Sequence, residues 1–450
     1  MRTKSSPKTS QEDLFRLRLE NMLDMRHELV RLSALIDWEK LETNLSSCLK
    51  NNAVGAPGLP SRLVTGVLYL QHAFGVSDES VVERWKENPY WQYFCGEEYF
   101  RHELPFHPTS LTKWRQRLGK DGCEALLQAT IDSAQTSKMV TPKDIKKVII
   151  DSTVQEKNIR FPTDSALLEK AREQLVTLCK KHDISLRQNY NREAPRLAVS
   201  VARYAYAKQF KRMKKALKTL KTRVGRVVRD IERQLTSQPE TIQEAFREKL
   251  AQAKKILQQT QKSKNKLYSL HAPETECISK GKAHKRFEFG VKASFVVTHK
   301  QGVVVGAQSC PGNPYDGHTL NDQLEQVEKL TGIQPKQCFA DKGYRGVETK
   351  EGTALYKSGQ KRGVKTKSMK AALKRRSAIE PEIGHMKQDG KLGRCYLKGV
   401  LGDAMNVILS GAGHNIRKLL NWLKLLFAWV LFWLQRQISQ QFRDQTAIAV

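Results

Sequence analysis

The stretch RRSAIEPEIGHMKQDGKLGR, residues 375–394, places two glutamates among arginines and lysines. Arg376, Glu380 and Lys387 are spaced by four and then seven residues, so a helix through them would align all three on one face. Carboxylates among cations either form ion pairs or hold a metal ion beside a bound phosphate. The stretch therefore leaves two interpretations open for Glu380 and Glu382, and the rest of the chain must separate them.

A structural role competes with the metal-binding role at the start of this helix. Residues Ser377 to Glu380 fit the S-x-x-E capping box, in which Glu380 would stabilise the first turn. Pro381 supports a helix that begins nearby, since proline is tolerated in the first turn. The two roles are compatible, because a carboxylate at a helix start is well fixed and could still face a metal. The cations that would hold phosphates beside it are Arg375, Arg376, Lys387 and Arg394.

The composition predicts a folded protein with a polyanionic partner. A chain of 450 residues is long enough for two or three domains with a buried core. The net charge is +32, from 78 Lys and Arg against 46 Asp and Glu, and nucleic acid is the first candidate partner. An anionic membrane surface is the weaker candidate, because no lipidation motif is present.

Cysteine usage and the chain ends predict a reducing environment. The eight cysteines are scattered singly, without the paired spacing of a structural zinc site. The first fifteen residues lack the apolar segment of a signal peptide, so a cytoplasmic location is expected. The apolar run Leu419–Leu434 contains Asn421 and Lys424 and is shorter than the roughly 18–20 residues of a spanning helix. It is predicted to be a buried or partner-facing helix, with no membrane partner.

Two short predicted strands, the first of them β-branched, end in aspartate. KKVIIDST, residues 146–153, and KQCFADKGY, residues 336–344, are predicted strands that end in Asp151 and Asp341. If the strands are neighbours, the two carboxylates lie a few Å apart. That arrangement suits two divalent cations separated by roughly 3.5–4 Å. Glu380 would be the third carboxylate, supplied by a helix.

The segments around these strands have their own patterns. Residues 286–299 and 302–310 are predicted to form a β-hairpin, and residues 316–332 a helix with Asp316 near its cap. Tyr344 either stacks on a base or fills the core, and the core is favoured. His318 is expected to have a structural role beside Asp316, and no role is assigned to His284.

The N-terminal third is predicted to be helical. A Gly/Pro-rich linker at residues 51–62 separates helices in residues 12–50 from a second helical region. There, Ser110 is predicted to cap a short basic helix. This region is either a helix-turn-helix-like DNA-binding module or a dimerisation domain with a solvated basic face. The cations on the short helix are Lys113, Arg115 and Arg117.

More than one hundred residues of helical pattern follow the first strand. Apolar residues recur at steps of three and four from Met213 to Leu235 and again from Ile242 to Leu257, which predicts an antiparallel helical hairpin. Its outer face is rich in Lys and Arg. The hairpin is either a soluble spacer or an arm that follows DNA phosphates.

The combination of motifs resembles a known family. IIDSTVQEKN, ADKGYRG and RRSAIEPEIGHMKQDGKLGR resemble the acidic motifs of the DDE transposases of bacterial insertion sequences, in particular the IS5-like group of the IS4/IS5 superfamily. Arg376, Glu380 and Lys387 match the group's signature Y-x2-R-x3-E-x6-K, whereas Leu373 stands at the tyrosine position. The match selects Glu380 over Glu382. Further similar blocks are LPSRLVTGVLYL, NPYWQYFCGE, HPTSLTKWRQRLG, GNPYDGHTL and GHNIRKLL.

The resemblance implies an α/β fold with an RNase H-like catalytic core. A long helical insertion would interrupt that core, and an all-α N-terminal domain would precede it. The expected domains are N-terminal helices at 1–50, a DNA-binding domain at 60–135, the catalytic core at 144–162 and 280–420, the basic insertion at 163–275 and an apolar C-terminal helix at 420–450.

The resemblance also implies a function. Asp151, Asp341 and Glu380 would bind two Mg2+ ions, with Mn2+ as a possible substitute. The protein would cleave the ends of its insertion sequence and join the 3′-hydroxyls to target DNA. A homodimer at the nucleoid, bound to double-stranded DNA, is expected. The alternative is an inactive or regulatory DNA-binding protein derived from such a transposase. The expected DNA contacts are Arg376, Lys387, Arg394, Lys113, Arg115 and Arg117.

Overall fold

The structure is a computed structural model that describes residues 16–46, 48, 59–279, 285–349, 351–360 and 366–448, with side chains as far as residue 425. Most of the expected linker, His284 and the side chains of the apolar run beyond residue 425 lie outside this description. The chain forms two compact units. The first unit is Met1–Gln155 with Lys292–Val450, and the second is Glu156–Val291.

The first unit begins with helices only. Side-chain caps define several of their starts: Ser77 accepts a hydrogen bond from the backbone N–H of Ser80, and Asn88 accepts one from that of Trp91. The helices are α1 (Leu19–Met22), α2 (Glu28–Leu35), α3 (Trp38–Ser46), α4 (Ser61–Ala73), α5 (Asp78–Glu87), α6 (Pro89–Phe94), α7 (Ser110–Thr136) and α8 (Pro142–Ile145).

Helix α7 differs from its sequence prediction in start and length. Thr109, not Ser110, is its N-cap residue, and no side chain caps it, so the prediction that Ser110 caps a short helix is wrong. The helix continues to Thr136 through a kink at Gly119, whose backbone has φ 60° and ψ −159°. Only glycine adopts that conformation without strain. Beyond the kink, Leu126 and Ile131 are buried, and this burial outweighs the local break.

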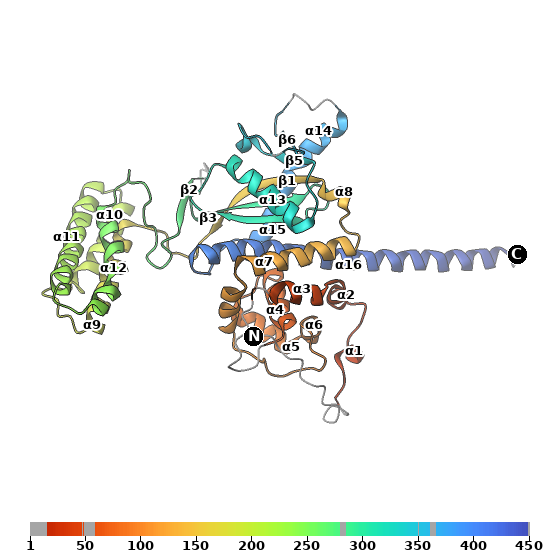
Figure 1. Cartoon of the computed structure of the whole chain (residues 1–450), viewed down its shortest axis with the longest axis horizontal. Helices are drawn as coiled ribbons and strands as arrows, with labels where there is room; N and C mark the ends of the chain where they lie inside the picture. Colours follow the sequence, from red (N-terminus) through yellow and green to blue (C-terminus); the bar gives the residue numbers. More distant parts are fainter. Residues whose placement is uncertain are drawn as a thin grey trace. The chain divides into compact units, whose positions relative to one another are not determined.

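A mixed sheet follows the helices (Figure 1). Its described strands lie in the order β2-β3-β1-β5-β6, and β4 pairs with β3. β3 and β4 are antiparallel and form the predicted hairpin, which turns at Gly302 with φ +69°. The strands are β1 (Lys147–Glu156), β2 (Glu276–Ser279), β3 (Phe287–Thr298), β4 (Val304–Cys310), β5 (Gln337–Ala340) and β6 (Ala354–Lys357).

The centre of the sheet is parallel. β1 pairs with β5 from Lys147↔Gln337 to Ile149↔Phe339, and β5 pairs with β6 in the same sense. β1 continues to Glu156, so the expectation that the first strand ends at Asp151 is wrong. The physical reason is that β3 lies along its other side and pairs with it beyond the reach of β5.

Further helices of the first unit pack around the sheet. They are η1 (Asp316–Thr319), α13 (Leu320–Thr331), η2 (Lys342–Tyr344), α14 (Lys367–Lys374), η3 (Arg375–Ala378), α15 (Ile379–Gln388) and α16 (Gly399–Ile448). The predicted helix at 316–332 is thus a 3-10 turn followed by α13, which ends at the left-handed Gly332. Figure 1 shows α7 and α16 running side by side.

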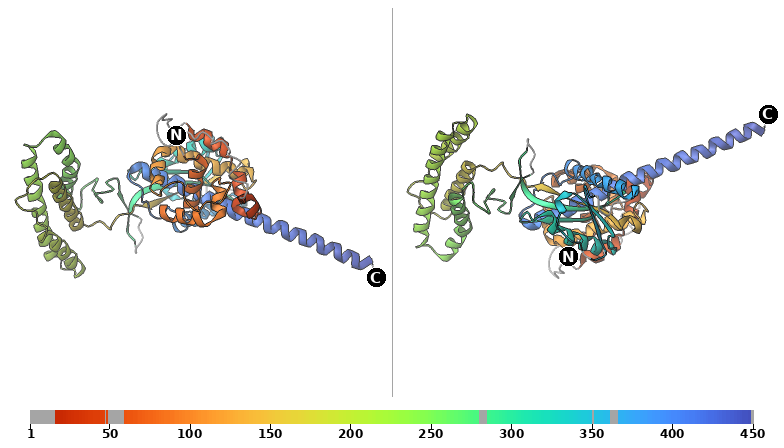
Figure 2. Two further views of the ribbon diagram at one scale, coloured as in Figure 1. Left: turned by 90° about the horizontal axis from the view of Figure 1, so that it is seen from below. Right: turned by 90° about the horizontal axis from the view of Figure 1, so that it is seen from above.

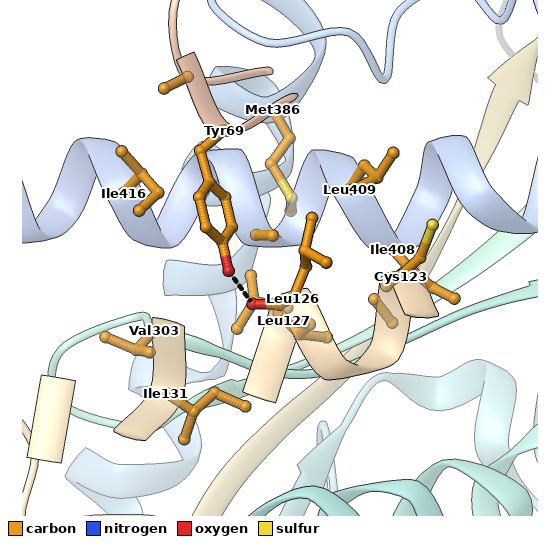
Figure 3. Packing of buried hydrophobic residues seen from close by; sticks show 14 of the residues in the cluster. Tyr69, Cys123, Leu126, Leu127, Ile131, Val303, Met386, Ile408, Leu409 and Ile416 are labelled. Carbon is orange, nitrogen blue, oxygen red and sulfur yellow. Dashed lines mark hydrogen bonds between the residues drawn. The ribbon is translucent and has the colours of Figure 1, made fainter. Parts of the chain in front are cut away.

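The core of the first unit joins α4, α7 and α16 to the hairpin. Figure 3 shows Tyr69 of α4, whose buried hydroxyl donates a hydrogen bond of 2.7 Å to the carbonyl of Leu126. Asn415 of α16 is also fully buried. Its side chain exchanges two hydrogen bonds of 2.8 Å with the backbone of Val304 in β4 and donates one to Thr130 of α7. A satisfied buried amide of this kind specifies the register of three elements.

The second unit contains four helices in its described part, α9 (Asp164–Lys181), α10 (Glu193–Tyr206), α11 (Phe210–Leu235) and α12 (Glu240–Gln258). They can be followed in both views of Figure 2. α11 and α12 form the predicted hairpin, and Leu220, Val224, Ile231 and Phe246 are buried in a core separate from that of the first unit.

The last helix, α16, continues through the predicted apolar segment to Ile448. Its packing is described as far as Leu423, which is buried against the first unit. Over the residues that the structure describes, no helix combines the length and the apolarity needed to cross a membrane.

Two glycines allow α16 to approach its neighbours closely. A Cβ atom on Gly411 would lie 3.0 Å from a methyl group of Val304, and one on Gly413 would lie 2.5 Å from the backbone carbonyl carbon of His72 in α4. Backbone atoms cannot yield as a flexible side chain does. The small residues of the segment SGAGHN therefore determine the distance between α16 and α4.

We expect Gly413→Ala to destabilise the protein by about 1–3 kcal/mol, because overpacking a core costs this much. Gly384→Ala is the matched control. It also lies within a helix, but nothing lies within 4 Å of its Cβ position. The control should gain up to about 1 kcal/mol from helix propensity. Urea denaturation of both variants tests this, and a stabilised Gly413→Ala protein would show that α16 and α4 do not meet there.

Candidate active site

The parallel pairing of β1 and β5 brings Asp151 and Asp341 to one edge of the sheet. Asp341 directly follows β5, and its side chain accepts a hydrogen bond of 2.7 Å from the backbone N–H of Gly343. Asp151 lies two residues beyond the last β1–β5 pair and accepts one of 2.8 Å from the N–H of Ser152. Both carboxylates are thereby oriented by the backbone.

Glu380 joins them from α15. Arg376 of η3 spans two of the carboxylates: its Nη2 lies 3.0 Å from Oε1 of Glu380, and its Nη1 lies 3.9 Å from Oδ2 of Asp151. The Asp151 carboxylate interacts electrostatically with both Asp341 and Glu380. The structure therefore brings Asp151, Asp341, Glu380 and Arg376 together at one place.

The electrostatics of Asp151 distinguish it from a surface carboxylate. Its side chain is 18% exposed, and burial raises the pKa of Asp151 to about 6. The negative charges of Asp341 and Glu380 raise it as well, whereas the Ser152 N–H and Arg376 only partly offset them. An ionised carboxylate in this position is costly until a cation neutralises it.

Asp316 is a fourth carboxylate of the site, which sequence reasoning placed only at a helix cap. Its Oδ1 accepts a hydrogen bond of 2.8 Å from the Ser152 hydroxyl and one of 3.0 Å from Nζ of Lys292. A Cβ atom on Gly343 would lie 2.9 Å from Oδ1 of Asp341 and 3.0 Å from Oδ2 of Asp316. Glycine at 343 therefore leaves room for two facing carboxylates. The signal in the sequence is the block GNPYDGHTL, whose aspartate the sequence alone assigns only to the start of the helix that follows.

Tyr344 lies beneath this edge. Its side chain is fully buried in the main core, as the favoured interpretation predicted. Burial raises the pKa of the Tyr344 phenol well above its ordinary value, and the nearby charges of Asp316 and Asp151 add to this effect. The phenol is therefore protonated at neutral pH.

The capping-box interpretation of Glu380 is wrong. Ala378 is the N-cap residue of α15, and the Ser377 hydroxyl donates to the carbonyl of Lys374. The chain is already helical through α14 and η3, so the start of α15 offers no free turn for a serine to cap. Glu380 is 59% exposed, and its carboxylate is directed to Arg376.

Glu382 has a different environment. Its carboxylate forms an ion pair with Nζ of Lys418 and lies 3.0 Å from Nε2 of His414. Both partners are on α16. Burial opposes its charge, but the hydrogen bonds from His414 and Lys418 outweigh that effect, so the pKa of Glu382 lies below its ordinary value. Lys418 also donates to the carbonyl of Gln301 in the β3–β4 turn. Glu382 thus attaches α15 to α16.

The six expected DNA contacts fall into separate groups. Arg376 lies among the carboxylates, and Lys113 and Arg117 are exposed on α7. Lys387 and Arg394 line a cavity of about 640 Å³, together with Arg115 and Tyr396.

The structure does not support Arg115 as a surface contact. Its side chain is 4% exposed, and its guanidinium donates hydrogen bonds of 2.6 Å to both Asp78 of α5 and Gln71 of α4. Arg115 lies on the inward face of α7, so its charge is used to join three helices. Lys113 and Arg117, on the outward face, keep their predicted role as a hypothesis.

The side chains of the site are of the kind that bind divalent cations. Carboxylate oxygens are the ligands that Mg2+ prefers, and Asp151, Asp341 and Glu380 supply three of them beside Asp316. In the described part of the chain, no three acidic, histidine or cysteine side chains already lie as close together as the ligands of one ion. Arg376 lies between two of these carboxylates and supplies positive charge there.

Two parts of the chain match family models of known proteins. Residues 17–117 match a family model described as a transposase domain (DUF772), and residues 334–420 match one described as a transposase DDE domain. The second range contains Asp341, Glu380 and Lys387. A protein of Rhizobium meliloti, described as uncharacterized protein ORF8 in the nfe locus, is 45% identical over 206 residues, which are 46% of this chain and 99% of that protein. No solved structure matches the chain.

We expect Glu382→Gln to lower the free energy of unfolding by about 2 kcal/mol, because it leaves Lys418 and His414 without their carboxylate. Glu380→Gln should change it by less than about 0.5 kcal/mol, since Glu380 is largely exposed. Urea denaturation of the two variants provides the comparison. Equal losses would mean that Glu382 does not anchor α15.

The raised pKa of Asp151 makes the metal-free protein sensitive to pH. A carboxyl whose folded pKa is about 6, against 3.8 in the unfolded chain, stabilises the fold below pH 4 and loses that contribution as the pH rises through 6. The loss amounts to at most about 3 kcal/mol. In EDTA, Asp151→Asn should therefore be more stable than wild type at pH 8 but not at pH 4. The reverse order at pH 8 would show that Arg376 dominates the site.

Proposed function

We propose that this chain, which matches transposase family models over residues 17–117 and 334–420, is a DDE-domain transposase that binds the ends of its own insertion sequence, cleaves them and joins the 3′-hydroxyls to target DNA. The observation that carries the proposal is the convergence of Asp151, Asp341 and Glu380 from two parallel strands and one helix. These three residues are proposed as the catalytic carboxylates, within an IS5-like transposase.

An RNase H-like core is part of the proposal. Its support is the sheet, in which β1, β5 and β6 are parallel and the β3–β4 hairpin is antiparallel. The acidic residues lie where the parallel strands end, and open α/β sheets commonly bind ligands at this edge. The helices α9 to α12 of the second unit would then be an insertion between β1 and β2.

Divalent metal ions are the cofactor that this family generally uses, and the residues present fit them. The site contains four carboxylates but only two cationic side chains among the described residues, Arg376 and Lys292. It therefore carries excess negative charge. Asp151, Asp341 and Glu380 would hold Mg2+ or Mn2+. Bound there, two ions would activate the attacking hydroxyl and stabilise charge on the leaving oxygen.

The chain's own residues do the positioning. The backbone N–H groups of Ser152 and Gly343 orient Asp151 and Asp341, and Glu382 holds α15 so that Glu380 reaches the same edge. Lys292 and Ser152 fix Asp316 beside them. Fixed ligands need little reorganisation when the scissile phosphate arrives, and such preorganisation is the largest source of catalysis in phosphoryl transfer.

Other cations of the first unit would hold DNA beside the site. Lys387 lies seven residues after Glu380 on α15, about 10 Å along the helix. With Arg394, it lines the 640 Å³ cavity against the N-terminal helices. We propose that these two residues hold DNA phosphates near the cleaved strand, and that Lys113 and Arg117 contact the duplex. A dimer that holds two DNA ends is part of the same proposal.

We expect Mg2+-dependent cleavage of a duplex that carries the flanking ends of this gene. Glu380→Gln should bind that duplex normally but cleave it roughly a thousandfold more slowly, because loss of one ligand removes several kcal/mol of transition-state stabilisation. Glu328→Gln, an exposed glutamate on α13, is the matched control and should cleave like wild type.

The same assay separates the proposal from its alternatives. Binding without cleavage by the wild type would favour a regulatory DNA-binding protein. Equal cleavage by wild type and Glu380→Gln would mean that the third ligand lies elsewhere. Cleavage without preference for the element's ends would indicate a general nuclease.

A further inference from the structure

The second unit contains a long stretch without acidic residues. Residues 194–229 include twelve Lys and Arg and no Asp or Glu, a net charge of +12 over 36 residues. The stretch spans most of α10 and of α11. A charge excess of this size is not required by a four-helix core, whose apolar residues already bury its interior.

The joint between α10 and α11 exposes most of this charge. We call residues 203–218 the elbow. It turns at Lys208, whose φ is +54°, and the N–H of Gln209 closes the turn on the carbonyl of Tyr204. The buried face of α11 begins only at Leu220, so the first turns of the helix project into solvent. The exposed cations of the elbow are Arg203, Lys208, Lys211, Arg212, Lys214, Lys215 and Lys218.

Aromatic side chains are interleaved with these cations. Tyr206, on the last turn of α10, is 93% exposed, and Phe210, the first residue of α11, is 56% exposed. Neither lies against the core of the unit. Exposed aromatic residues surrounded by Lys and Arg are typical of surfaces that contact nucleic acid, where rings pack against sugars and bases.

The arrangement does not stabilise the unit itself. Lys211 and Arg212 lie in the first turn of α11, where the helix dipole disfavours cations. Lys211, Lys215 and Lys218 repel one another at spacings of three and four residues. Within the described part of the chain, only Arg223 of the twelve forms an ion pair, with Glu193 at 3.0 Å. The elbow therefore lacks an internal counter-charge.

We propose that the elbow binds double-stranded DNA through its phosphates, without regard to sequence. From Lys211 to Lys218 the helix rises about 10 Å, over which a duplex carries about six negative charges. An anionic membrane fits less well, because an interfacial helix needs a continuous exposed apolar face, and the apolar face of α11 is buried in the core.

This inference rests on the proposed function for its biological meaning and adds a second DNA surface to it. The first unit would hold the ends of the element, and the elbow would hold DNA of any sequence, as capture of a target requires. Binding at the elbow needs no metal and none of the catalytic carboxylates.

The experiment measures binding of full-length protein to a duplex of unrelated sequence, in EDTA, at several salt concentrations. In the elbow variant, Lys211, Arg212, Lys214 and Lys215 are all changed to Gln. Its slope of log affinity against log salt should be shallower by about 3–4, and its affinity at 150 mM salt should fall at least about tenfold. The matched control changes four exposed lysines elsewhere in the unit, Lys180, Lys181, Lys262 and Lys264, to Gln and should retain the wild-type slope.

A second variant tests the aromatic residues and keeps the result interpretable. Tyr206→Ala with Phe210→Ala should weaken binding at every salt concentration without changing the slope. An elbow variant that has the wild-type circular dichroism and the wild-type slope overturns the proposal. So does elbow-dependent binding to phosphatidylglycerol vesicles without binding to duplex.

The two proposals fail separately. Elbow-dependent binding by a protein that never cleaves its ends would refute the proposed catalytic function alone. Normal end cleavage by a protein that binds unrelated duplex equally well with and without the elbow charges would refute this inference alone.

Discussion

Mutual repulsion among carboxylates at the edge of the β1–β5 pair is the constraint on which the site depends. Asp151, Asp341 and Glu380 come from two strands and a helix, and burial with like charges raises the pKa of Asp151 to about 6. Such a group tends to move apart unless its members are fixed. The fold opposes this tendency with the backbone N–H groups of Ser152 and Gly343, which hold Asp151 and Asp341, and with Arg376, which pairs with Glu380. Carboxylates that are held close together despite their repulsion favour the binding of a cation between them.

The supports of the site extend into the core of the first unit. Glu382 connects α15 to α16 through Lys418 and His414, and Asn415, one residue after His414, connects α16 to β4. Gly413 lets the same turn of α16 pack against α4. One segment of α16 thus contacts α15, the β3–β4 hairpin and the N-terminal helix α4. This explains why the two glutamates of the opening motif differ: Glu380 lies beside Arg376 and the aspartates, whereas Glu382 holds their shared helix against α16.

The sequence allowed prediction wherever the signal was local. The two short strands before Asp151 and Asp341, the hairpin at residues 286–310 and the α11–α12 pair were all predicted, because their apolar patterns are visible within one segment. What failed depended on distant partners. Arg115 appeared to be a surface cation, because only the tertiary fold shows Asp78 and Gln71 around it. Asp316 appeared to be a cap, because its partners Ser152 and Lys292 lie 164 and 24 residues away.

The distribution of positive charge separates two tasks that a basic composition alone does not distinguish. In the first unit, Arg115, Arg376 and Lys418 are paired with carboxylates, and their charge is used within the fold. In the second unit, the cations of residues 203–218 have no carboxylate partner among the described residues. Paired cations shape a site, whereas unpaired ones raise the local concentration of a polyanion and release its counterions on binding. The net charge of +32 therefore comes from two kinds of cation, those paired with carboxylates and those without such a partner. Only the second kind should determine the salt dependence of binding to DNA of arbitrary sequence.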